Sequence, residues 1–375
     1  MRFEKYPFEK LNELLLHVKP NEEYREMVLT IGEPQLKTPN FIQKSVCENI
    51  ELLNRYPKSA GEEFLKESMI EFFRTRFSIE LKMEQIVPVF GTREALFNLP
   101  QFLLFDKISP KMAFTNPFYQ IYEGAAIASG AKPIYLDLKP SRDFKVSPDP
   151  EVLKNCDLVV LNFPNNPTGA VLDMDELKEW VLAALEYDFV LINDECYSEI
   201  YDTAPPPSLL NAAREVGNDD YRNVLVVNSL SKRSSAPGLR SGFVAGDEKL
   251  LKEYMRYRTY LGCASPLPLQ YGAAAAWRDS SHVTANRDLY RNNFKLAKEI
   301  LNIAPPKATF YLWLEVGDDL EFTKRVYGEY NLKVLPGRFL GRNGAGEGYI
   351  RAALVYEPAK TKEALNRLKE AMKGN

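Results

Sequence analysis

A chain of 375 residues with 45% hydrophobic and 26% charged side chains has the composition of a globular protein. Its length predicts roughly two to three domains. The 48 basic and 51 acidic residues nearly cancel, to a formal net charge of −3, and no basic stretch follows the pattern of a nucleic-acid-binding surface. We therefore expect small molecules as partners, and no nucleic acid.

The cysteines, the histidines and the N-terminus argue against several classes of protein. Four cysteines are scattered without a C-x-x-C pair, which predicts free thiols in a reducing compartment. With only two histidines we expect no metal site, and a Ser-His-Asp mechanism has little support. The N-terminal residues mix both charge signs, unlike a signal peptide, and no apolar run approaches the ~18 residues of a membrane span. The sequence therefore predicts a cytoplasmic protein with no membrane association.

Seven short apolar runs in the middle of the chain predict buried strands. Several are separated by helical patterns, at 94–104, 121–129 and 173–186, and this alternation predicts a mostly parallel sheet covered on both faces. Asp173, with Glu176 three residues later, predicts a capped helix start. The predicted strands, each stopped by or next to Asn, Asp, Gly or Pro, are Ile86–Phe90, Lys111–Thr115, Pro133–Leu136, Leu158–Asn162, Phe189–Asn193, Val224–Asn228 and Phe243–Ala245.

Beyond Gly262 the pattern changes to that of a smaller α+β unit. The first forty or so residues have no strand–helix rhythm of their own, and we expect them to wrap onto this unit. The elements predicted after Gly262 are a long helix at 279–301, a strand at 309–315, a helix at 320–329, a strand at 349–355 and a final helix from Pro358.

The predicted fold class is therefore α/β. A mostly parallel seven-stranded sheet, sandwiched by helices, forms the large domain, and a smaller α+β domain completes the molecule. We expect the large domain to span residues 45–262 and the small domain to combine residues 1–44 with residues 263–375.

A lysine follows directly after one predicted strand. Ser229-Leu230-Ser231-Lys232 comes after the strand Val224–Asn228, and Gly238-Leu239-Arg240 follows, with Arg240 eight residues after the lysine. Open α/β sheets bind ligands at the ends of such strands, and two hydroxyls with a guanidinium suit a phosphate group. A surface lysine would explain the first motif alone, but the glycine and arginine at this spacing favour a binding site.

Two further strands are followed by polar motifs. Asp194 and Tyr197 lie after one strand, in Asn193-Asp194-Glu195-Cys196-Tyr197, and Asn166 lies after another, in Asn165-Asn166-Pro167-Thr168-Gly169. Helix capping and turn formation would explain these residues as well. A carboxylate and an amide at strand ends are equally suited to holding a ligand in the same crevice.

Four other residues complete the candidate site. Thr92 and Arg93 begin a helix after a strand and a glycine, where free backbone N–H groups bind phosphate. Tyr119 follows a strand and could lie against a flat ring, although aromatic residues there are more often core. Arg351 lies within an apolar strand, and its charge requires a carboxylate partner from the protein or from a substrate.

Together these motifs match the physical requirements of pyridoxal phosphate. The cofactor needs a lysine amine for a Schiff base, a carboxylate opposite the pyridine nitrogen, and donors to the ring oxygen. It also needs an anion cradle for its phosphate and an apolar face against its ring. A nucleotide site has less support, because the chain has no P-loop and no dinucleotide fingerprint.

The set resembles the class I/II aminotransferases of pyridoxal-phosphate fold type I. The motifs occur in the order typical of that family and extend over most of the chain, from Gly32 to Arg351. The residues that carry the resemblance are Gly91-Thr92-Arg93-Glu94-Ala95-Leu96, Asn116-Pro117-Phe118-Tyr119, Asn166-Pro167-Thr168-Gly169, Asp194-Glu195-Cys196-Tyr197, Ser229 to Lys232, Gly238-Leu239-Arg240 and Arg351.

The resemblance implies a catalytic role for three residues: Lys232 as Schiff-base lysine and proton carrier, Asp194 as pyridinium partner and Tyr197 as ring-oxygen donor. It also implies a homodimer with shared active sites, in which Tyr56 reaches the phosphate of the partner subunit. The remaining implied roles are those of Asn166 as a second ring-oxygen donor, Tyr119 as stacking aromatic, Thr92, Arg93, Ser229, Ser231 and Arg240 around the phosphate, and Gly32, Asn166 and Arg351 at the substrate α-carboxylate.

One segment points to a narrower group. Relatives of this family commonly have an aromatic residue two positions after the lysine, whereas Arg233-Ser234-Ser235-Ala236-Pro237 follows here. With Asn-Asp-Glu-Cys-Tyr-Ser-Glu-Ile-Tyr, this segment resembles the bacterial N-succinyldiaminopimelate aminotransferases.

The expected function is transamination between glutamate, as amino donor, and N-succinyl-2-amino-6-ketopimelate in lysine and diaminopimelate biosynthesis. The alternatives are an aminotransferase for another amino acid, a fold-type I C–S lyase, and a non-catalytic ligand sensor of the same fold.

Overall fold

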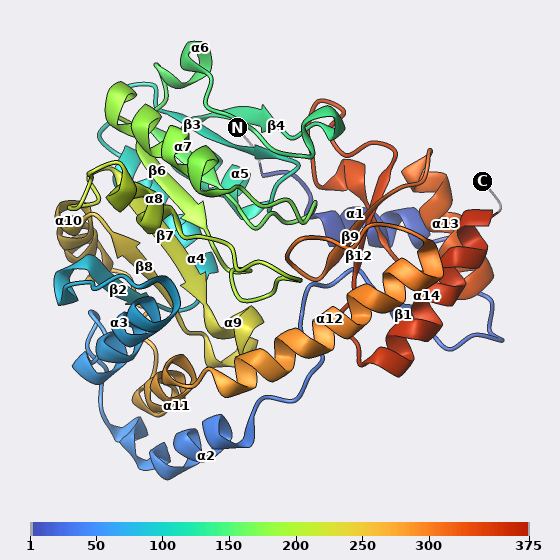
Figure 1. Ribbon diagram of the computed structural model, residues 1–375, viewed down its shortest axis with the longest axis horizontal. Coiled ribbons are helices and arrows are strands. Elements are labelled where there is room, and N and C mark those ends of the chain that lie inside the picture. The colour runs from blue at the N-terminus through green and yellow to red at the C-terminus, as the bar shows by residue number, and fades with distance from the viewer. Residues whose placement is uncertain (1–2, 374–375) are drawn as a thin grey trace.

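A seven-stranded sheet lies at the centre of the computed structural model, which describes residues 3–373 (Figure 1). Its strand order is β2-β8-β7-β6-β5-β3-β4, and every neighbouring pair is parallel except the two that involve β8. This confirms the predicted α/β class and the mostly parallel sheet. The strands are β2 (Ile86–Val89), β3 (Lys111–Asn116), β4 (Lys132–Asp137), β5 (Leu158–Leu161), β6 (Val190–Asp194), β7 (Val224–Ser229) and β8 (Gly242–Gly246).

Strand β8 runs antiparallel to both of its neighbours, β7 and β2. Gly242, the first residue of β8, is paired with Ser229 at the end of β7 and with Val89 at the end of β2. A Cβ atom at Gly242 would lie 2.6 Å from the carbonyl oxygen of Asn228, so this close pairing requires glycine. The start of β8 and the ends of β2 and β7 therefore meet at one edge of the sheet.

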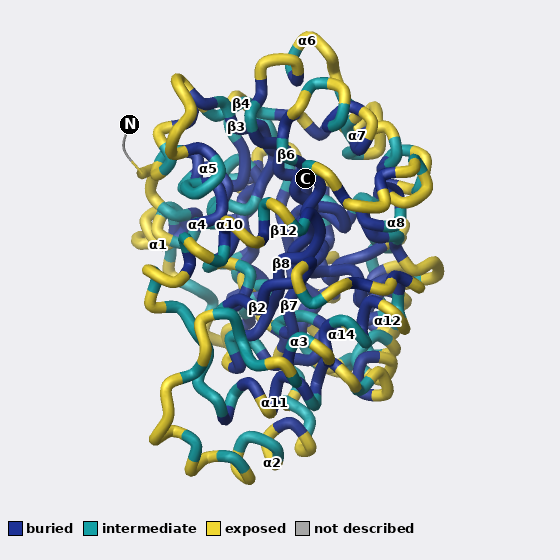
Figure 2. The backbone as a smooth tube through the Cα atoms, turned by 90° about the vertical axis from the view of Figure 1, so that its left-hand side faces the viewer, coloured by how far each residue is buried: buried dark blue, intermediate teal, exposed yellow. Residues whose placement is uncertain are grey.

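Helices cover both faces of the sheet, because successive strand residues point to opposite sides. In β7, Val224 and Val226 belong to one buried cluster, while Leu225 and Val227 belong to another. Figure 2 shows β7 and β8 within the buried interior. The first cluster contains α3 (Glu63–Phe77), α7 (Met174–Tyr187), α8 (Leu209–Glu215) and α11 (Leu267–Arg278), and the second contains α4 (Thr92–Leu104), α5 (Ile121–Ala128) and α10 (Glu248–Arg258).

Helix α7 has the predicted start. The Asp173 side chain accepts a hydrogen bond from the Glu176 backbone N–H at 3.0 Å, and the Glu176 side chain accepts one from the Asp173 backbone N–H at 2.7 Å. This reciprocal capping box satisfies donors that the first helical turn leaves without partners.

The C-terminal part of the chain forms a smaller unit with its own buried cluster. A three-stranded antiparallel sheet of order β11-β12-β9 lies beside a two-stranded parallel pair of β1 and β10. Helix α12 extends from the large sheet to this unit (Figure 1). The elements are β9 (Tyr311–Glu315), β10 (Leu332–Lys333), β11 (Leu335–Pro336), β12 (Tyr349–Ala353), α12 (Ser281–Leu301), α13 (Asp319–Tyr330) and α14 (Pro358–Lys373).

The N-terminal segment packs onto this unit, as expected. Its strand β1 (Met27–Val28) pairs with β10, and its helix α1 (Pro7–Leu15) packs against Leu335 and Leu340. The short remaining elements are α2 (Asn40–Glu48), α6 (Pro150–Leu153), α9 (Leu230–Arg233) and the 3₁₀ helices η1 (Ile50–Asn54), η2 (Met83–Gln85), η3 (Pro140–Arg142), η4 (Pro237–Leu239) and η5 (Gly337–Phe339).

The division of the chain into residues 45–262 and residues 1–44 plus 263–375 stays a prediction. Ile42 in α2 and Trp277 in α11 both belong to a buried cluster of the large sheet. We therefore propose that the large domain includes α2 and α11 and ends near residue 278. Within residues 3–373, no helix has both the length and the apolar character needed to cross a membrane.

Candidate active site

A cavity of about 860 Å³ opens at the edge of the large sheet where β6 and β7 end. The small unit and the N-terminal segment contribute Arg351 and Gly32 to its wall. Every predicted site residue except Tyr56 lines this cavity, namely Gly32, Thr92, Arg93, Tyr119, Asn166, Asp194, Tyr197, Ser229, Ser231, Lys232, Arg240 and Arg351. Parallel strands bring their carboxyl ends to one edge, which explains why motifs far apart in the sequence meet here.

Lys232 lies in the short helix α9, directly after β7. Its Nζ donates a hydrogen bond to the carbonyl oxygen of Gly32 and lies 5.7 Å from the centre of the Phe310 ring. Among the described residues Lys232 has no carboxylate in ion-pair contact. Its amine is therefore held in the cavity by a neutral acceptor.

Arg240 lies beside Gly91, at the start of α4. Its guanidinium donates to the carbonyl oxygens of Pro237 at 2.8 Å and Phe90 at 3.2 Å. A Cβ atom at Gly91 would lie 2.2 Å from a nitrogen of the Arg240 guanidinium, so glycine leaves room for this side chain beside the backbone. Burial, together with the neighbouring positive charge of Arg93, lowers the pKa of Arg240. Two guanidinium groups near a helix N-terminus form a site that favours an anion.

Asp194 is a buried carboxylate at the end of β6. The Tyr122 hydroxyl donates a hydrogen bond to it at 2.9 Å, and the backbone N–H of Cys196 donates another at 3.2 Å. Burial raises the pKa of Asp194, and its hydrogen bonds and the positive charge of Lys232 act in the opposite direction. A carboxylate that is buried with only neutral donors is stabilised by a ligand that brings a positive charge.

Arg351 and Asn166 are hydrogen-bonded to each other across the cavity wall. Arg351 Nη1 donates to Asn166 Oδ1 at 2.7 Å, and Nη2 donates to the carbonyl oxygen of Thr30 at 2.7 Å. The buried Nε of Arg351 has no hydrogen-bond partner among the described residues. Because Asn166 accepts through its oxygen, its amide nitrogen remains available as a donor. The carboxylate that Arg351 requires is not provided by residues 3–373.

Arg93 and Tyr119 form a second pair at the wall. Arg93 Nε donates to the Tyr119 hydroxyl at 2.7 Å, and the guanidinium carbon lies 5.8 Å from the centre of the Tyr119 ring. This neutral partner leaves the positive charge of Arg93 uncompensated by any carboxylate in the described chain. Its terminal nitrogens are available to a negatively charged ligand.

Several hydroxyl groups of the cavity wall lie close to one another or to the Cys196 sulfur. The hydroxyls of Tyr197 and Tyr311 are 2.9 Å apart. The Cys196 sulfur lies 3.2 Å from the Thr92 hydroxyl and 3.7 Å from the Ser229 hydroxyl. Burial raises the pKa of the Cys196 thiol well above its usual value, so this cysteine is a neutral wall residue.

Tyr56 lies outside this cavity. Its side chain is fully exposed in the single chain, and Ile50 and Leu53 nearby in the sequence are also exposed, as is Tyr260. The role of Tyr56 at a partner's site stays a prediction.

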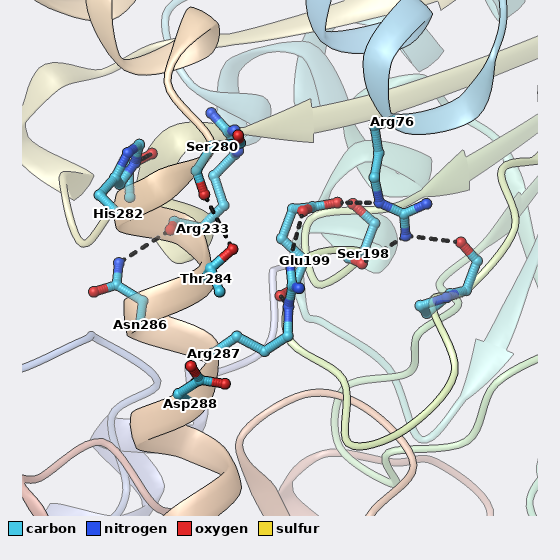
Figure 3. A network of polar contacts seen from close by, with 12 residues as sticks. Arg76, Ser198, Glu199, Arg233, Ser280, His282, Thr284, Asn286, Arg287 and Asp288 are labelled. Carbon is cyan, nitrogen blue, oxygen red and sulfur yellow. Dashed lines mark hydrogen bonds and ion pairs between the residues drawn. The ribbon is translucent and has the colours of Figure 1, made fainter.

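The Arg233–Pro237 segment, in contrast, faces away from the cavity except at Pro237. Arg233 is buried and donates to the Ala276 carbonyl oxygen at 2.9 Å, while Asn286 donates to the Arg233 carbonyl oxygen (Figure 3). Ser234 contacts His282, with Oγ 2.8 Å from Nε2. This segment, whose sequence resembles one group of aminotransferases, therefore anchors the lysine-bearing loop to α11 and α12, and Pro237 is its one residue that lines the cavity.

Several cavity residues escape sequence reasoning. Tyr311 lies in the apolar strand β9 and has the pattern of a core residue, whereas Tyr6, directly before α1, and Glu33, after β1, come from the N-terminal segment. No local signal identifies them, because packing of the N-terminal segment and the small unit brings them to the sheet edge.

Comparison with known proteins identifies the family. The model of the aminotransferase class I and II family matches residues 25–368. The LL-diaminopimelate aminotransferase of Natranaerobius thermophilus is 31% identical over 360 residues, which cover 91% of this chain and 90% of that protein.

Two solved structures are more similar still. Aminotransferase AspB of Helicobacter pylori is 47% identical with a TM-score of 0.98, and the alignment covers 100% of both chains. An aminotransferase of Neisseria meningitidis is 39% identical with a TM-score of 0.94, over 98% of both chains. The chain therefore belongs to the class I and II aminotransferases, which are pyridoxal-phosphate-dependent enzymes.

Proposed function

We propose that this aminotransferase exchanges an amino group between glutamate and N-succinyl-2-amino-6-ketopimelate. The observation that carries the proposal is the presence of two cations, Arg351 and Arg93, that line one cavity and have no carboxylate partner among the described residues. Both substrates carry a carboxylate next to the reacting carbon and another at the far end of the molecule.

The residues around Arg240 suit the phosphate of the cofactor. The guanidinium of Arg240 and the free N–H groups of the first turn of α4, at Thr92 and Arg93, supply donors to an anion. The hydroxyls of Ser229 and Ser231 line the same cavity. We infer that these groups hold the phosphate and fix the position of the ring relative to Lys232.

Asp194 and Lys232 suit the chemistry of the ring. When bound, pyridoxal phosphate supplies an aldehyde that takes up the substrate amine and a protonated ring nitrogen that withdraws electrons from the reacting carbon. Asp194 would accept a hydrogen bond from that nitrogen and keep it protonated. Lys232 Nζ would take the proton from the substrate Cα and deliver it to the former aldehyde carbon of the cofactor, and it would move a proton in the reverse direction during the second half of the reaction.

Four further side chains orient the reactants. Tyr197 and the Asn166 amide would donate to the ring oxygen, and Tyr119 would lie against the ring. Arg351 binds the α-carboxylate, beside the backbone of Gly32, and so fixes which substituent of Cα faces Lys232. The unpartnered Nε of Arg351 supports this assignment, because a buried guanidinium donor is stabilised by an acceptor.

Arg93 is the best candidate for the far carboxylate. Its terminal nitrogens have no protein partner among the described residues, its Nε is fixed by Tyr119, and the apolar side chains of Ile31, Leu335 and Leu340 also line the cavity. A long substrate with carboxylates at both ends fits this arrangement better than alanine or an aromatic amino acid. The name of the Natranaerobius relative, an LL-diaminopimelate aminotransferase, supports a substrate of the diaminopimelate type.

We also propose a homodimer. Exposed apolar side chains gather in the segment of Ile50, Leu53 and Tyr56, and Tyr260 is exposed as well. Burial of these side chains against a second copy would be favourable. Tyr56 of the partner subunit would then reach the phosphate. Light scattering after size-exclusion chromatography tests this proposal, and a monomer at micromolar concentration would contradict it.

We further propose a cytoplasmic location. All four cysteines, Cys47, Cys156, Cys196 and Cys263, are free thiols in the structure. Free thiols persist in a reducing compartment.

A panel of keto acids tests the substrate assignment. The enzyme is supplied with glutamate, and formation of 2-oxoglutarate is followed with N-succinyl-2-amino-6-ketopimelate, oxaloacetate, pyruvate or phenylpyruvate as acceptor. We expect the highest kcat/KM for the succinylated acceptor. A higher value for pyruvate or phenylpyruvate would assign another amino acid, and pyruvate release from cystathionine without transamination would assign C–S lysis. LL-diaminopimelate, tested in the reverse direction, distinguishes the free diamine from its succinylated form.

The variant Arg93→Ala tests the far-carboxylate site. Loss of a charged hydrogen bond of about 1.5–3 kcal/mol should raise KM for glutamate by roughly 10- to 150-fold. The kcat/KM for alanine, which has no second carboxylate, should change less than about threefold. Arg222→Ala, at an exposed arginine outside the cavity, is the matched control. An equal loss for glutamate and alanine would assign Arg93 to the cofactor instead.

A further inference from the structure

Tyr311 touches three residues to which the proposed function gives separate roles. Its hydroxyl lies 2.9 Å from the Tyr197 hydroxyl, and its ring centre lies 4.4 Å from the guanidinium carbon of Arg351. The same hydroxyl fills the space beside Gly32, where a Cβ atom would lie only 1.7 Å away. Tyr311 is buried, with 2% of its surface exposed, and it lines the cavity.

The hydroxyl of Tyr311 restricts the direction in which Tyr197 can donate. Each phenol has one proton and two acceptor positions, so one of the pair must donate to the other. If Tyr311 donates, the Tyr197 proton is free to point at an acceptor in the cavity. A negatively charged ring oxygen there would favour this orientation, because the two phenols then form a chain of donors directed at the charge.

The ring of Tyr311 stabilises the charge of Arg351. The guanidinium lies over the ring, its Nη1 and Nη2 donate to Asn166 and Thr30, and its Nε has no partner. An aromatic face stabilises a desolvated guanidinium without occupying its donors. A protein carboxylate at this place would stabilise the charge as well, but it would compete with a substrate carboxylate.

We propose that Tyr311 is a positioning residue with two separable parts. The hydroxyl directs the Tyr197 proton at the cofactor, and the ring holds Arg351 ready for the substrate carboxylate. This inference rests on the roles that the proposed function gives to Tyr197 and Arg351. It goes beyond them because one side chain, Tyr311, positions both the donor to the cofactor and the cation that binds the substrate. The contact with Gly32 explains why a larger residue at position 32 would displace the hydroxyl from Tyr197.

Two variants of the full-length holoenzyme separate the parts. Tyr311→Phe removes the hydroxyl and keeps the ring, whereas Tyr311→Leu removes both. Tyr290→Phe, at a fully buried tyrosine of the same core cluster that does not line the cavity, is the matched control. Should Tyr311→Leu not fold, Tyr311→Met replaces it, because the flexible methionine side chain fills irregular space.

The first readout is the pH titration of the absorbance of the bound cofactor, which requires no turnover. A donor to the ring oxygen favours the deprotonated chromophore, in which that oxygen carries the most negative charge. Loss of the Tyr311 hydroxyl weakens the donor, so the midpoint in Tyr311→Phe should rise by about 0.5 to 1 pH unit. Tyr290→Phe should titrate like the wild type.

The second readout is the dissociation constant of succinate, an unreactive dicarboxylate, measured by calorimetry. Tyr311→Leu should weaken succinate binding about tenfold or more, because a desolvated cation–π contact is lost, while Tyr311→Phe should change it less than about twofold. An unchanged midpoint in Tyr311→Phe, equal weakening by both variants, or the same shift in Tyr290→Phe would overturn the proposal. If wild-type enzyme neither binds succinate nor transaminates glutamate, the proposed function fails instead.

Discussion

The cavity differs in its charge pairing from the polar network of Arg76, Glu199 and Arg287 between α3 and α12. In the network, Glu199 is buried between two arginines, with Arg76 at 2.6 Å and Arg287 at 3.2 Å (Figure 3). In the cavity, Arg351 and Lys232 donate only to neutral oxygens. Both regions connect the large sheet to the smaller unit, yet among residues 3–373 the arginines of the network have a carboxylate partner, and Arg351 and Lys232 have none.

This difference separates structural charges from functional ones. A buried charge is tolerated when it is paired, and an unpaired one costs free energy unless a ligand compensates it. The cavity contains several charged side chains without a partner of opposite charge, which is the pattern of a binding site. Variants in the cavity should therefore lose activity and keep their stability, while variants in the network should do the reverse.

The largest expected effect is in the cavity. Lys232→Ala removes both the amine that attaches the cofactor and the proton carrier, so kcat should fall by on the order of 10⁴-fold or more. The absorbance of the lysine-bound cofactor should disappear. The thermal unfolding midpoint of the cofactor-free variant should equal that of the cofactor-free wild type. Lys252→Ala, at an exposed lysine of α10, is the control. A coloured, fully active Lys232 variant would contradict the assignment.

A smaller effect, of the opposite kind, is expected in the network. Glu199→Ala leaves two partly buried guanidinium groups without their carboxylate and should lower the free energy of unfolding by roughly 3–5 kcal/mol. Activity per folded molecule should stay within about twofold. Denaturant unfolding measures the change. Glu253→Ala breaks an exposed pair with Arg256 and should cost at most about 1 kcal/mol. Equal losses in the two variants would remove the distinction between network and surface.

The smallest effect concerns the pH dependence of stability. Burial raises the pKa of Glu195 to about 7, although Leu209 N–H, Ser208 and Asn193 donate to its carboxylate. A raised folded-state pKa contributes stability that is complete below about 4.5, the value for an unfolded glutamate, and is lost as the pH rises through about 7.

Glu195→Gln should abolish this contribution. Between pH 5 and pH 7 the wild type should lose about 2 kcal/mol of unfolding free energy relative to the variant. Urea unfolding at several pH values provides the comparison. Glu186→Gln, at an exposed position of α7, should leave the pH profile unchanged. Parallel profiles for Glu195→Gln and the wild type would refute a titrating Glu195.

The large sheet and much of the cavity are predictable from sequence because their signals are local. Each of the seven strands is a short apolar run, and Lys232, Asp194 and Asn166 directly follow strand ends or lie within a few residues of them. Parallel topology then brings these ends together without any knowledge of side-chain packing. The predicted helix at 279–301 begins at Ser281, because the separate helix α11 ends at Arg278.

Other parts depend on long-range packing and have no local signal. Tyr311 has the sequence pattern of a core residue, and it becomes a cavity residue only because β9 packs beside Gly32. The Arg233–Pro237 segment resembles that of aminotransferases with one particular substrate. Arg233 and Ser234 nevertheless contact α11 and α12 and not the cavity. Which side of a polar segment faces a cavity is decided by its neighbours in space.

The reversed direction of β8 has a consequence for protein engineering. The chain leaves the cavity edge at Ser229 and returns to the same edge at Gly242, so Lys232 and Arg240 are carried by a single loop between two paired strand ends. That loop can therefore be exchanged as one unit. Grafting residues 230–241 onto the matching strands of another member of the family would transfer both side chains together, with their mutual spacing preserved by the hydrogen-bonded junction.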